Sequence, residues 1–403
     1  TVTEAGHTRR PDLVVFVNGL PLAVIELKSA TSANATIWTA VQQLQTYKAD
    51  IPALFETNDL LIASDGYTAR LGSLTADWSR FGPWRRIDGH QDIEAELELE
   101  VLLRGLFERG RLLRYLRSYC VWEQGQNPVK KIAGYHQFYG VEHAVERAVV
   151  AHQGRERRAG VIWHTQGSGK SLSMVFFAGR MLQHKAMSNP TLVVLTDRND
   201  LDDQLYRQFV AAKDLLRETP EQAQSREHLR TLLDRPSGGV IFSTLQKLGT
   251  RKGERMPVLC GRDNVVIIAD EAHRSHYDTV DGLARNLDDA LPNAVRIGFT
   301  GTPIEREDRS TPEIFGDYID TYTVRQSVAD GATVPIYYES RLARLDLPEE
   351  ERPRIDADFQ EVTEDEEQDT TLKLSTTWAS LEKVVGLKKR LKLHEGKLPV
   401  DET

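Results

Sequence analysis

The chain has 403 residues, a formal net charge of −9 and 40% hydrophobic residues. This length predicts two to three domains, the hydrophobic content is ordinary for a folded protein, and no apolar run approaches the roughly 18 residues that span a membrane. The two cysteines, Cys120 and Cys260, are not in a C-x-x-C pair. This argues against a zinc site and a disulfide framework and favours a reducing, cytoplasmic location. The chain starts at Thr1 without a signal-peptide pattern, so we expect a trimmed or incomplete N-terminus.

The charged residues are unevenly spread. Residues 346–369 are strongly acidic, whereas basic residues cluster at Arg85-Arg86, 104–117, Lys130-Lys131 and 155–158. Phosphates meet local patches rather than the average charge, so a net charge of −9 does not exclude DNA binding. Each basic cluster can equally be a solvated helix face, and the sequence leaves both interpretations open.

The first part of the chain is expected to mix strands and helices. β-rich stretches flank the turn dipeptide Asn18-Gly19, which is a strong hairpin signal. Further elements are expected in chain order: strands 13–17 and 22–27, a helix over 30–49, a turn at Asp65-Gly66, helical residues 92–117 and a linker at 125–128.

From residue 132 to about 300, strands alternate with helices, which predicts a parallel sheet covered on both faces. The expected strands are 160–163, 191–195, 239–242, 265–269 and 294–299. Beyond residue 340, the acidic stretch 346–369 is typical of a mobile linker, and 370–392 is expected to form a helix.

Asp12, Glu26 and Lys28 have residue types and a spacing that suit metal-dependent phosphodiester hydrolysis. Such hydrolysis needs a divalent cation that activates water and neutralises developing charge. Mg²⁺ prefers one or two carboxylates together with water and substrate oxygens. We therefore expect Asp12 and Glu26 to bind the metal, and Lys28 to orient the water or stabilise the developing charge.

This site requires Asp12 and Glu26 to share one face of the hairpin, because side chains alternate along a strand. A two-residue turn at Asn18-Gly19 would place Asp12 opposite Ile25 and turn Glu26 away. An odd-length loop with Gly19 as a bulge would restore the shared face. We therefore predict an odd-length loop.

Gln43 and Tyr47 lie four residues apart and so share one face of the following helix. The pattern Pro11-Asp12, Glu-x-Lys and Gln-x3-Tyr resembles the PD-(D/E)xK nucleases, in particular the branch with the downstream Gln/Tyr motif. The resemblance implies catalytic roles for all five residues and a restriction-endonuclease-like mixed β-sheet domain. Glu4 is a candidate for the additional upstream acid of that family. An exposed ion pair on a surface hairpin is the non-functional alternative.

A phosphate-binding loop follows the expected strand 160–163. Its glycines let backbone N–H groups approach phosphates, and the helix that follows favours an anion at its N-terminus. Lys170 would reach the β- and γ-phosphates of ATP, and Ser171 would hold Mg²⁺. His164 stands where the general pattern has a glycine. The expected nucleotide-binding residues are Thr165, Gly167, Ser168, Gly169, Lys170 and Ser171.

A second nucleotide signature, Asp270-Glu271-Ala272-His273, follows the apolar strand 265–269. Asp270 would bind Mg-ATP through water, Glu271 would polarise the attacking water, and His273 would link the ATP site to the DNA side. Thr300 begins a Thr-Gly-Thr-Pro turn that resembles the helicase coupling motif. Gln137 resembles the adenine-reading glutamine of such motors, a plain helix start being the alternative. Two further strand ends, 196–199 and 243–247, are in positions where motors touch DNA.

These motifs together resemble the first RecA-like domain of superfamily-two helicases. A nuclease followed by a DEAH motor resembles the motor (R) subunit of type I restriction enzymes. The resemblance implies ATP and Mg²⁺ as cofactors, double-stranded DNA as substrate, and methyltransferase (M) and specificity (S) subunits as partners. We expect a nuclease domain over 1–125, a RecA-like parallel-sheet P-loop domain over 126–340, and an acidic linker with the start of a second motor domain over 341–403.

No second set of motor motifs follows residue 340, so we expect a fragment that binds ATP but hydrolyses it poorly. Two alternatives remain open. One is a DEAH-type helicase of repair or of another restriction system, with a leading domain that only resembles a nuclease. The other is a non-catalytic module that binds nucleotide or DNA. A P-loop kinase or GTPase fits less well, because no guanine-specific motif is present.

Overall fold

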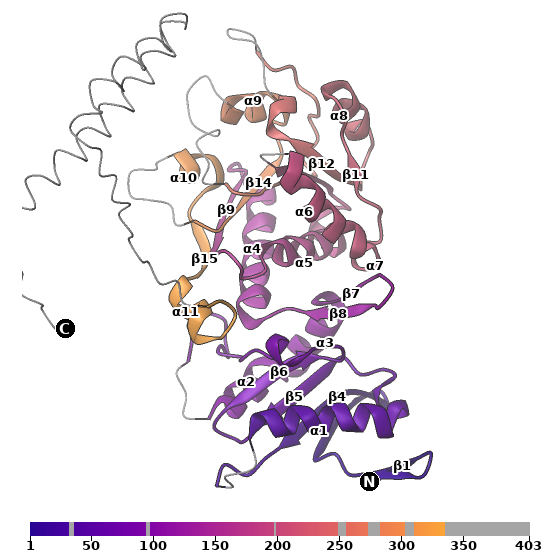
Figure 1. Ribbon diagram of the computed structural model, residues 1–403. Helices are drawn as coiled ribbons and strands as arrows, with labels where there is room; N and C mark the ends of the chain where they lie inside the picture. The colour runs from indigo at the N-terminus through magenta and orange to yellow at the C-terminus, as the bar shows by residue number, and fades with distance from the viewer. Residues whose placement is uncertain are drawn as a thin grey trace, which may run out of the picture. The chain divides into compact units, whose positions relative to one another are not determined.

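The computed structural model divides the chain into two compact units, 1–335 and 336–403, and the residues described here belong to the first (Figure 1). They are 1–31, 36–93, 97–196, 199–248, 255–272, 283–302 and 310–334. The expected linker at 346–369, the helix at 370–392, His273, Asp197 and Arg198 therefore lie outside the described residues.

The N-terminal part contains a mixed four-stranded sheet in the order β3-β4-β5-β6. β3 and β4 are antiparallel, β4 and β5 parallel, and β5 and β6 antiparallel, which confirms the expected mixed sheet. Helix α1 packs its apolar face, with Leu44 and Tyr47, against this sheet. The bounds are β1 Val2–Glu4, β2 His7–Arg9, β3 Leu13–Val17, β4 Leu20–Leu27, α1 Ile37–Asp50, η1 Pro52–Phe55, β5 Leu60–Ser64 and β6 Ala69–Ser73.

The β3–β4 hairpin corrects one prediction. Val17 pairs with Leu20, so the loop has two residues, Asn18 and Gly19, and the predicted odd-length loop is wrong. Both loop residues have positive φ, 51° and 83°, as a tight hairpin turn requires. The extra residue lies inside β4 instead: Phe16 pairs with Pro21 but Val15 pairs with Ala23, so Leu22 forms a bulge.

Two short helices and a hairpin connect the sheets. The helical stretch expected over 92–117 is interrupted at Glu108, whose carboxylate caps the second helix through the backbone N–H groups of Gly110 and Arg111. The expected linker at 125–128 lies in the loop of the antiparallel β7–β8 hairpin. The bounds are η2 Trp78–Arg80, α2 Glu98–Leu106, α3 Arg109–Ser118, β7 Cys120–Glu123 and β8 Val129–Ile132.

The second large sheet has seven parallel strands in the order β11-β12-β10-β13-β14-β9-β15, which confirms the predicted parallel sheet. All five strands expected from the sequence are present. The strand bounds are β9 Arg158–His164, β10 Thr191–Thr196, β11 Glu221–Gln222, β12 Val240–Thr244, β13 Val265–Ala269, β14 Val295–Thr300 and β15 Tyr318–Tyr322. The helix bounds are α4 Tyr135–Gln153, α5 Lys170–Gln183, η3 Lys185–Met187, α6 Asn199–Ala211, α7 Lys213–Leu216, α8 Arg226–Leu233, η4 Leu245–Leu248, α9 Leu283–Ala290, α10 Ser310–Phe315 and α11 Val324–Ala329.

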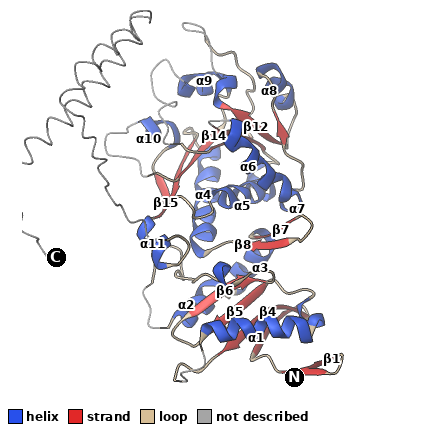
Figure 2. Ribbon diagram, in the orientation of Figure 1, coloured by secondary structure: helices blue, strands red, loops and turns tan. Residues whose placement is uncertain are grey.

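Helices cover both faces of this sheet (Figure 2). Neighbouring residues of one strand belong to different core clusters, because side chains alternate across a sheet: Ile268 packs with α4 and α5, whereas Ile267 packs with α8 and α9. The first cluster extends through Trp84 into the N-terminal sheet, where it includes Ile62. The boundary at residue 125 stays a prediction. In the described part of the chain, every helix is too short or too polar to cross a membrane.

Candidate functional site

The bulge at Leu22 places Asp12 beside the end of β4. With this extra residue, Leu13 pairs with Ile25, so Asp12 comes level with Glu26 rather than with Ile25. The Asp12 carboxylate accepts a hydrogen bond of 2.8 Å from the backbone N–H of Leu27. The shared face that the sequence required is therefore present, although a bulge in the strand creates it instead of the loop.

Lys28 connects this hairpin to helix α1. Its Nζ atom donates to Glu26 Oε1 at 2.9 Å and also to Gln43 Oε1. Gln43 Nε2 in turn donates to the hydroxyl of Tyr47, one helical turn later. The Tyr47 hydroxyl donates to the backbone carbonyl of Arg10, at 3.3 Å, just before Asp12. The structure thus brings all five predicted nuclease residues into one cluster.

Burial dominates the electrostatics of this cluster. Only 2% of Glu26 is exposed, and its Oε2 atom has no hydrogen-bond partner among the described residues. Burial raises the pKa of Glu26 above its ordinary value of 4.5, and the nearby Asp12 carboxylate adds to this, while Lys28 opposes it. Burial likewise raises the pKa of Tyr47.

The residues present fit a divalent cation. A buried carboxylate oxygen without a partner is costly, and a cation supplies the charge that would compensate it. No cluster of three or more His, Cys, Asp or Glu side chains suited to a metal occurs in the described ranges. Two carboxylates suffice for Mg²⁺, because this ion keeps several water ligands. Glu4 lies elsewhere: its carboxylate accepts from the backbone N–H of Ala53 at 3.0 Å.

The predicted phosphate loop joins β9 to α5. Gly167 and Gly169 have φ angles of +82° and +84°, conformations that favour glycine. The helix begins at Lys170, so its N-terminal N–H groups face the loop. Ser168 donates through its hydroxyl to the carbonyl of Thr165 at 2.6 Å, which fixes the loop from inside.

Asp270 and Thr300 lie at the same edge of the sheet as this loop, because the strands are parallel and their carboxyl ends meet there. An ideal Cβ atom on Gly301 would come within 2.5 Å of Lys170 Nζ, so the lysine lies against the turn that follows Thr300. Asp270 follows β13 directly and accepts from the backbone N–H of Glu271 at 2.9 Å. Glu271 has a φ of 48°, a strained backbone conformation for this residue type.

Gln137, the predicted adenine contact, lies against the phosphate loop. Its Nε2 atom donates to the carbonyl of Gly169 at 2.9 Å, and its Oε1 atom accepts from the backbone N–H of Gly134 at 2.8 Å. The neighbouring His136 makes a second contact with the loop, 3.1 Å from its Nε2 atom to the carbonyl of Ser168. No sequence motif identified His136 as a contact of the phosphate loop.

Asp320, the partner of His164, was also not identified from the sequence. His164 is fully buried, and its Nε2 atom lies 2.9 Å from Oδ2 of Asp320. Asp320 belongs to β15, which pairs with β9 although the two strands are far apart in the sequence. The available signal was a histidine in the place of the first loop glycine.

Comparisons with known proteins agree with this arrangement. The model of the SWI2/SNF2 ATPase family matches residues 136–372, and the model of the N-terminus of the type I restriction enzyme R protein matches residues 1–80. The HindI endonuclease subunit of a type I restriction enzyme from Haemophilus influenzae is 46% identical over 96% of the chain. The SsaAORF53P endonuclease subunit of a type I restriction enzyme from Staphylococcus saprophyticus is 30% identical over 81% of the chain.

The chain spans 38% and 34% of the lengths of these two relatives. Among solved structures, the ATP-dependent type ISP restriction-modification enzyme LlaBIII bound to DNA matches 76% of the chain and 21% of its own, with 14% identity and a TM-score of 0.34. The family models cover the nuclease and the motor motifs in the order in which this structure presents them. The chain therefore belongs to the SWI2/SNF2 ATPase family, and its similarity to an endonuclease subunit of a type I restriction enzyme extends over nearly its whole length.

Proposed function

We propose that this chain carries a Mg²⁺-dependent endonuclease site and the first half of an ATP-driven motor that translocates double-stranded DNA. The observation that carries the nuclease proposal is the cluster of Asp12, Glu26 and Lys28 at the end of β4, in which Oε2 of Glu26 is buried without a hydrogen bond from the described residues. A surface ion pair would leave no such oxygen, since water would satisfy it.

At the nuclease site, Asp12 and Glu26 would hold the cation. When bound, it supplies Lewis-acid stabilisation of the scissile phosphate and a more acidic water. Lys28, which donates to Glu26 and Gln43, is held where its charge can stabilise the developing negative charge. Gln43 and Tyr47 fix the lysine from the helix side, so their roles are positional.

At the motor site, the loop from Thr165 to Ser171 would bind the phosphates of ATP. Lys170 lies at the N-terminus of α5, where positive charge and backbone N–H groups favour an anion. Asp270 and Ser171 would hold Mg²⁺ with the nucleotide, and Glu271 would orient the attacking water. Gln137 would contact the adenine base, Thr300 would belong to the coupling motif, and His273 would link the ATP site to the DNA side.

We further propose that the chain acts on duplex DNA together with methyltransferase and specificity subunits, in the cytoplasm. The relatives are endonuclease subunits of type I restriction enzymes by name, which supports this assignment. Recognition of a DNA sequence would then belong to another subunit, and this chain would supply movement and cleavage.

Cleavage of supercoiled plasmid in the presence of Mg²⁺ tests the proposal. The chain is compared with Lys28→Ala and with Lys131→Ala, a lysine of the β7–β8 hairpin that pairs with Glu123. Each is assayed with and without partner subunits and ATP. We expect Mg²⁺-dependent cutting that disappears in Lys28→Ala and persists in Lys131→Ala. Equal cutting by all three chains would remove the nuclease proposal, and nucleotide binding without any cutting would favour a helicase or a binding module.

A further inference from the structure

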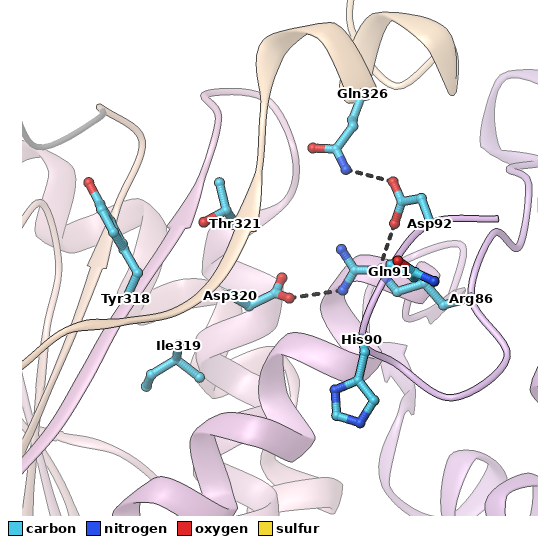
Figure 3. A pocket seen from close by; sticks show the side chains of 9 residues that line it. All are labelled: Arg86, His90, Gln91, Asp92, Tyr318, Ile319, Asp320, Thr321 and Gln326. Carbon is cyan, nitrogen blue, oxygen red and sulfur yellow. Dashed lines mark hydrogen bonds and ion pairs between the residues drawn. The ribbon is translucent and has the colours of Figure 1, made fainter. Parts of the chain in front are cut away.

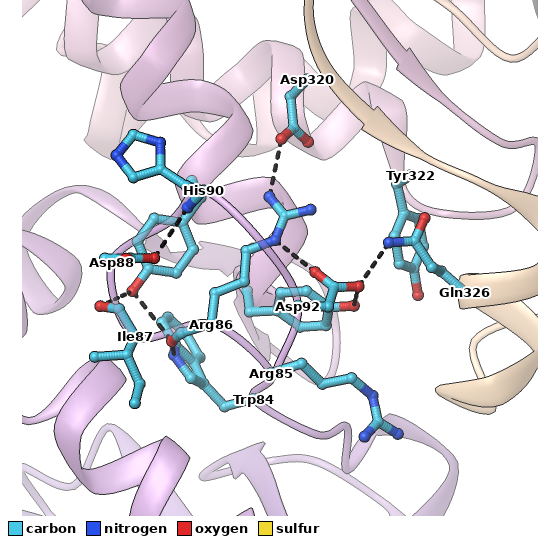
Figure 4. Close-up of polar contacts among 12 residues, drawn as sticks. Trp84, Arg85, Arg86, Ile87, Asp88, His90, Asp92, Asp320, Tyr322 and Gln326 are labelled. Carbon is cyan, nitrogen blue, oxygen red and sulfur yellow. Dashed lines mark hydrogen bonds and ion pairs between the residues drawn. The ribbon is translucent and has the colours of Figure 1, made fainter. Parts of the chain in front are cut away.

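A loop that follows the N-terminal sheet lies against the motor sheet. Residues 85–93, here called the arginine loop, are closed by a hydrogen bond of 2.8 Å from the backbone N–H of Ile93 to the carbonyl of Arg85. Trp84 Nε1 donates to the carbonyl of Arg86 at 2.7 Å, and the Tyr139 hydroxyl donates to the carbonyl of Ile87 at 2.9 Å (Figure 4). The arginine loop is therefore held in one conformation by its own backbone and by α4.

Arg86 begins a chain of contacts that ends at the phosphate loop. Its guanidinium donates to Asp92 Oδ1 through Nε at 2.7 Å and to Asp320 Oδ1 through Nη1 at 2.8 Å. The other oxygen of Asp320 binds His164, as described above. His164 immediately precedes Thr165, the first residue of the phosphate loop. Figure 3 shows Asp320 and Asp92 on two sides of the Arg86 guanidinium.

Arg85 begins a second, parallel chain. It pairs with Asp330, whose other oxygen accepts from the hydroxyl of Tyr322 at 2.8 Å. The ring of Tyr322 stacks on His136 with a centroid distance of 3.9 Å and an interplanar angle of 3°. His136 contacts the carbonyl of Ser168 within the phosphate loop. Two consecutive arginines are thus connected to two points of the same loop.

These contacts are buried, which makes them strong and specific. Side-chain exposure is 5% for Arg86, 8% for Asp320 and 0% for His164. Burial alone would raise the pKa of Asp320, but the contacts with His164 and Arg86 hold it below its ordinary value. Gly140 of α4 leaves room for the pair: a Cβ there would lie 3.2 Å from both Asp320 and His164.

A pocket of about 470 Å³ lies beside this junction. Arg86, Asp92, Asp320 and Gln326 line it together, and Gln326 Nε2 donates to Asp92 at 2.6 Å (Figure 3). The second oxygen of Asp92 therefore accepts a hydrogen bond from a residue of α11. Arg86, Asp92 and Asp320 thus all have partners among the described residues, whereas the Nδ1 atoms of His136 and His164 are buried without one.

We propose that Arg85 and Arg86 are positioning residues for the phosphate loop, so that a segment outside the motor's own motifs completes its ATP site. The inference rests on the proposed binding of ATP at Lys170. Its physical basis is that the buried guanidinium of Arg86, paired with two carboxylates, fixes Asp320, which fixes the ring of His164 and hence the start of the phosphate loop. Nucleotide binding would then also stabilise the contacts of the arginine loop, because energetic coupling between two sites is reciprocal.

The test measures the affinity of the 403-residue chain for a fluorescent ATP analogue with Mg²⁺. Arg86→Lys keeps the charge but cannot reach both carboxylates in the planar geometry of a guanidinium. Asp320→Asn is a nearly isosteric second variant. The matched control is Arg180→Lys, because Arg180 also donates to a largely buried carboxylate, Glu142, at 2.8 Å, without a contact to His164 among those described. Thermal unfolding without nucleotide is measured for each variant.

We expect Arg86→Lys and Asp320→Asn each to weaken binding about tenfold, and the double variant to be no weaker than either single one, because both interrupt one chain. Arg180→Lys should bind like the unaltered chain. A purely structural role would lower the unfolding temperature without changing affinity below it, and this outcome would overturn the inference, as would additive losses.

Lys170→Ala distinguishes a failure of the proposed nucleotide site from a failure of the positioning role of Arg86. Loss of binding in this variant supports the proposed nucleotide site, whatever the result for Arg86. If the unaltered chain and Lys170→Ala bind the analogue equally, the proposed site is wrong and the inference falls with it. If Lys170→Ala loses binding while Arg86→Lys and Asp320→Asn keep it, only the inference fails.

Discussion

The ammonium group of Lys28 donates to Oε1 of Glu26 at 2.9 Å, while Oε2 of the same carboxylate is buried and has no hydrogen-bond partner among the described residues. Only one of the two carboxylate oxygens is thus compensated by a hydrogen-bond donor. Burial without compensation destabilises the ionised carboxylate. Such an arrangement is explicable when the site binds a cation, and it has consequences for cleavage, metal affinity and stability.

Glu26→Gln should reduce Mg²⁺-dependent plasmid cleavage by at least about a hundredfold, because the Lewis-acid contribution of a metal is worth several kcal/mol. The matched control is Glu123→Gln, which changes a carboxylate on the β7–β8 hairpin that pairs with Lys131. Initial rates of nicking, with partner subunits and ATP present, provide the measurement. Similar losses in both variants would mean that the substitution acts through the general fold.

Metal affinity should fall as the pH drops toward the raised pKa of Glu26, because a protonated carboxylate is a poor ligand for Mg²⁺. Since burial raises that pKa, the loss should occur at a higher pH than the ordinary value of 4.5. In Lys28→Ala the loss should move to still higher pH, because Lys28 lowers the pKa of Glu26. Calorimetric Mg²⁺ titrations across the pH range measure both shifts; an unchanged profile in Lys28→Ala would contradict the assigned contact.

Thermal stability should depend on Glu26 with a defined sign. A carboxyl group whose folded pKa is raised contributes stability below its unfolded pKa, and this contribution is lost as the pH rises through the folded pKa. Without metal, Glu26→Gln should therefore unfold at a higher temperature than the unaltered chain at pH 7, and at a similar temperature near about pH 4. Scanning calorimetry at both pH values decides this; a less stable variant at pH 7 would contradict the burial argument.

Gly19→Ala should destabilise the chain by about 1 kcal/mol, because alanine is strained at a φ of 83°. An added Cβ at Gly19 meets no atom within 4 Å, so the backbone conformation alone accounts for the cost. Gly82→Ala is the control, because its Cβ also meets nothing and no positive φ occurs there. Urea unfolding measures both variants. Equal stabilities would mean that the turn relaxes without cost.

The two-residue turn shows where reasoning from the sequence reached its limit. The need for Asp12 and Glu26 to share one face followed from the alternation of side chains along strands. That alternation does not say where in the hairpin the extra residue lies. The bulge lies at Leu22 because β4 also pairs with β5, where Ala23 and Leu60 lie opposite each other. Pairing with a third strand is a long-range property, and no local turn signal contains it.

Gln137 illustrates a second limit. Its position before the phosphate loop was recognisable from the sequence, and the structure places it against that loop. Which atoms it contacts depends on the approach of α4 to β9, which the packing of Phe138 and Tyr139 on Trp84 determines. The contact with Gly169 therefore became visible only in the folded chain.

The sequence by itself determined the local elements and motifs of this protein. The hydrophobic pattern predicted the five strands of the large parallel sheet, and the spacing of short motifs predicted a nuclease site and a phosphate loop, because these signals are local to the chain. Only the tertiary structure decided the bulge at Leu22 and the link from Arg86 through Asp320 to His164. Arg86 and Asp320 are separated by 234 residues along the chain, and their burial in the folded structure, rather than any sequence pattern, makes their charges interact.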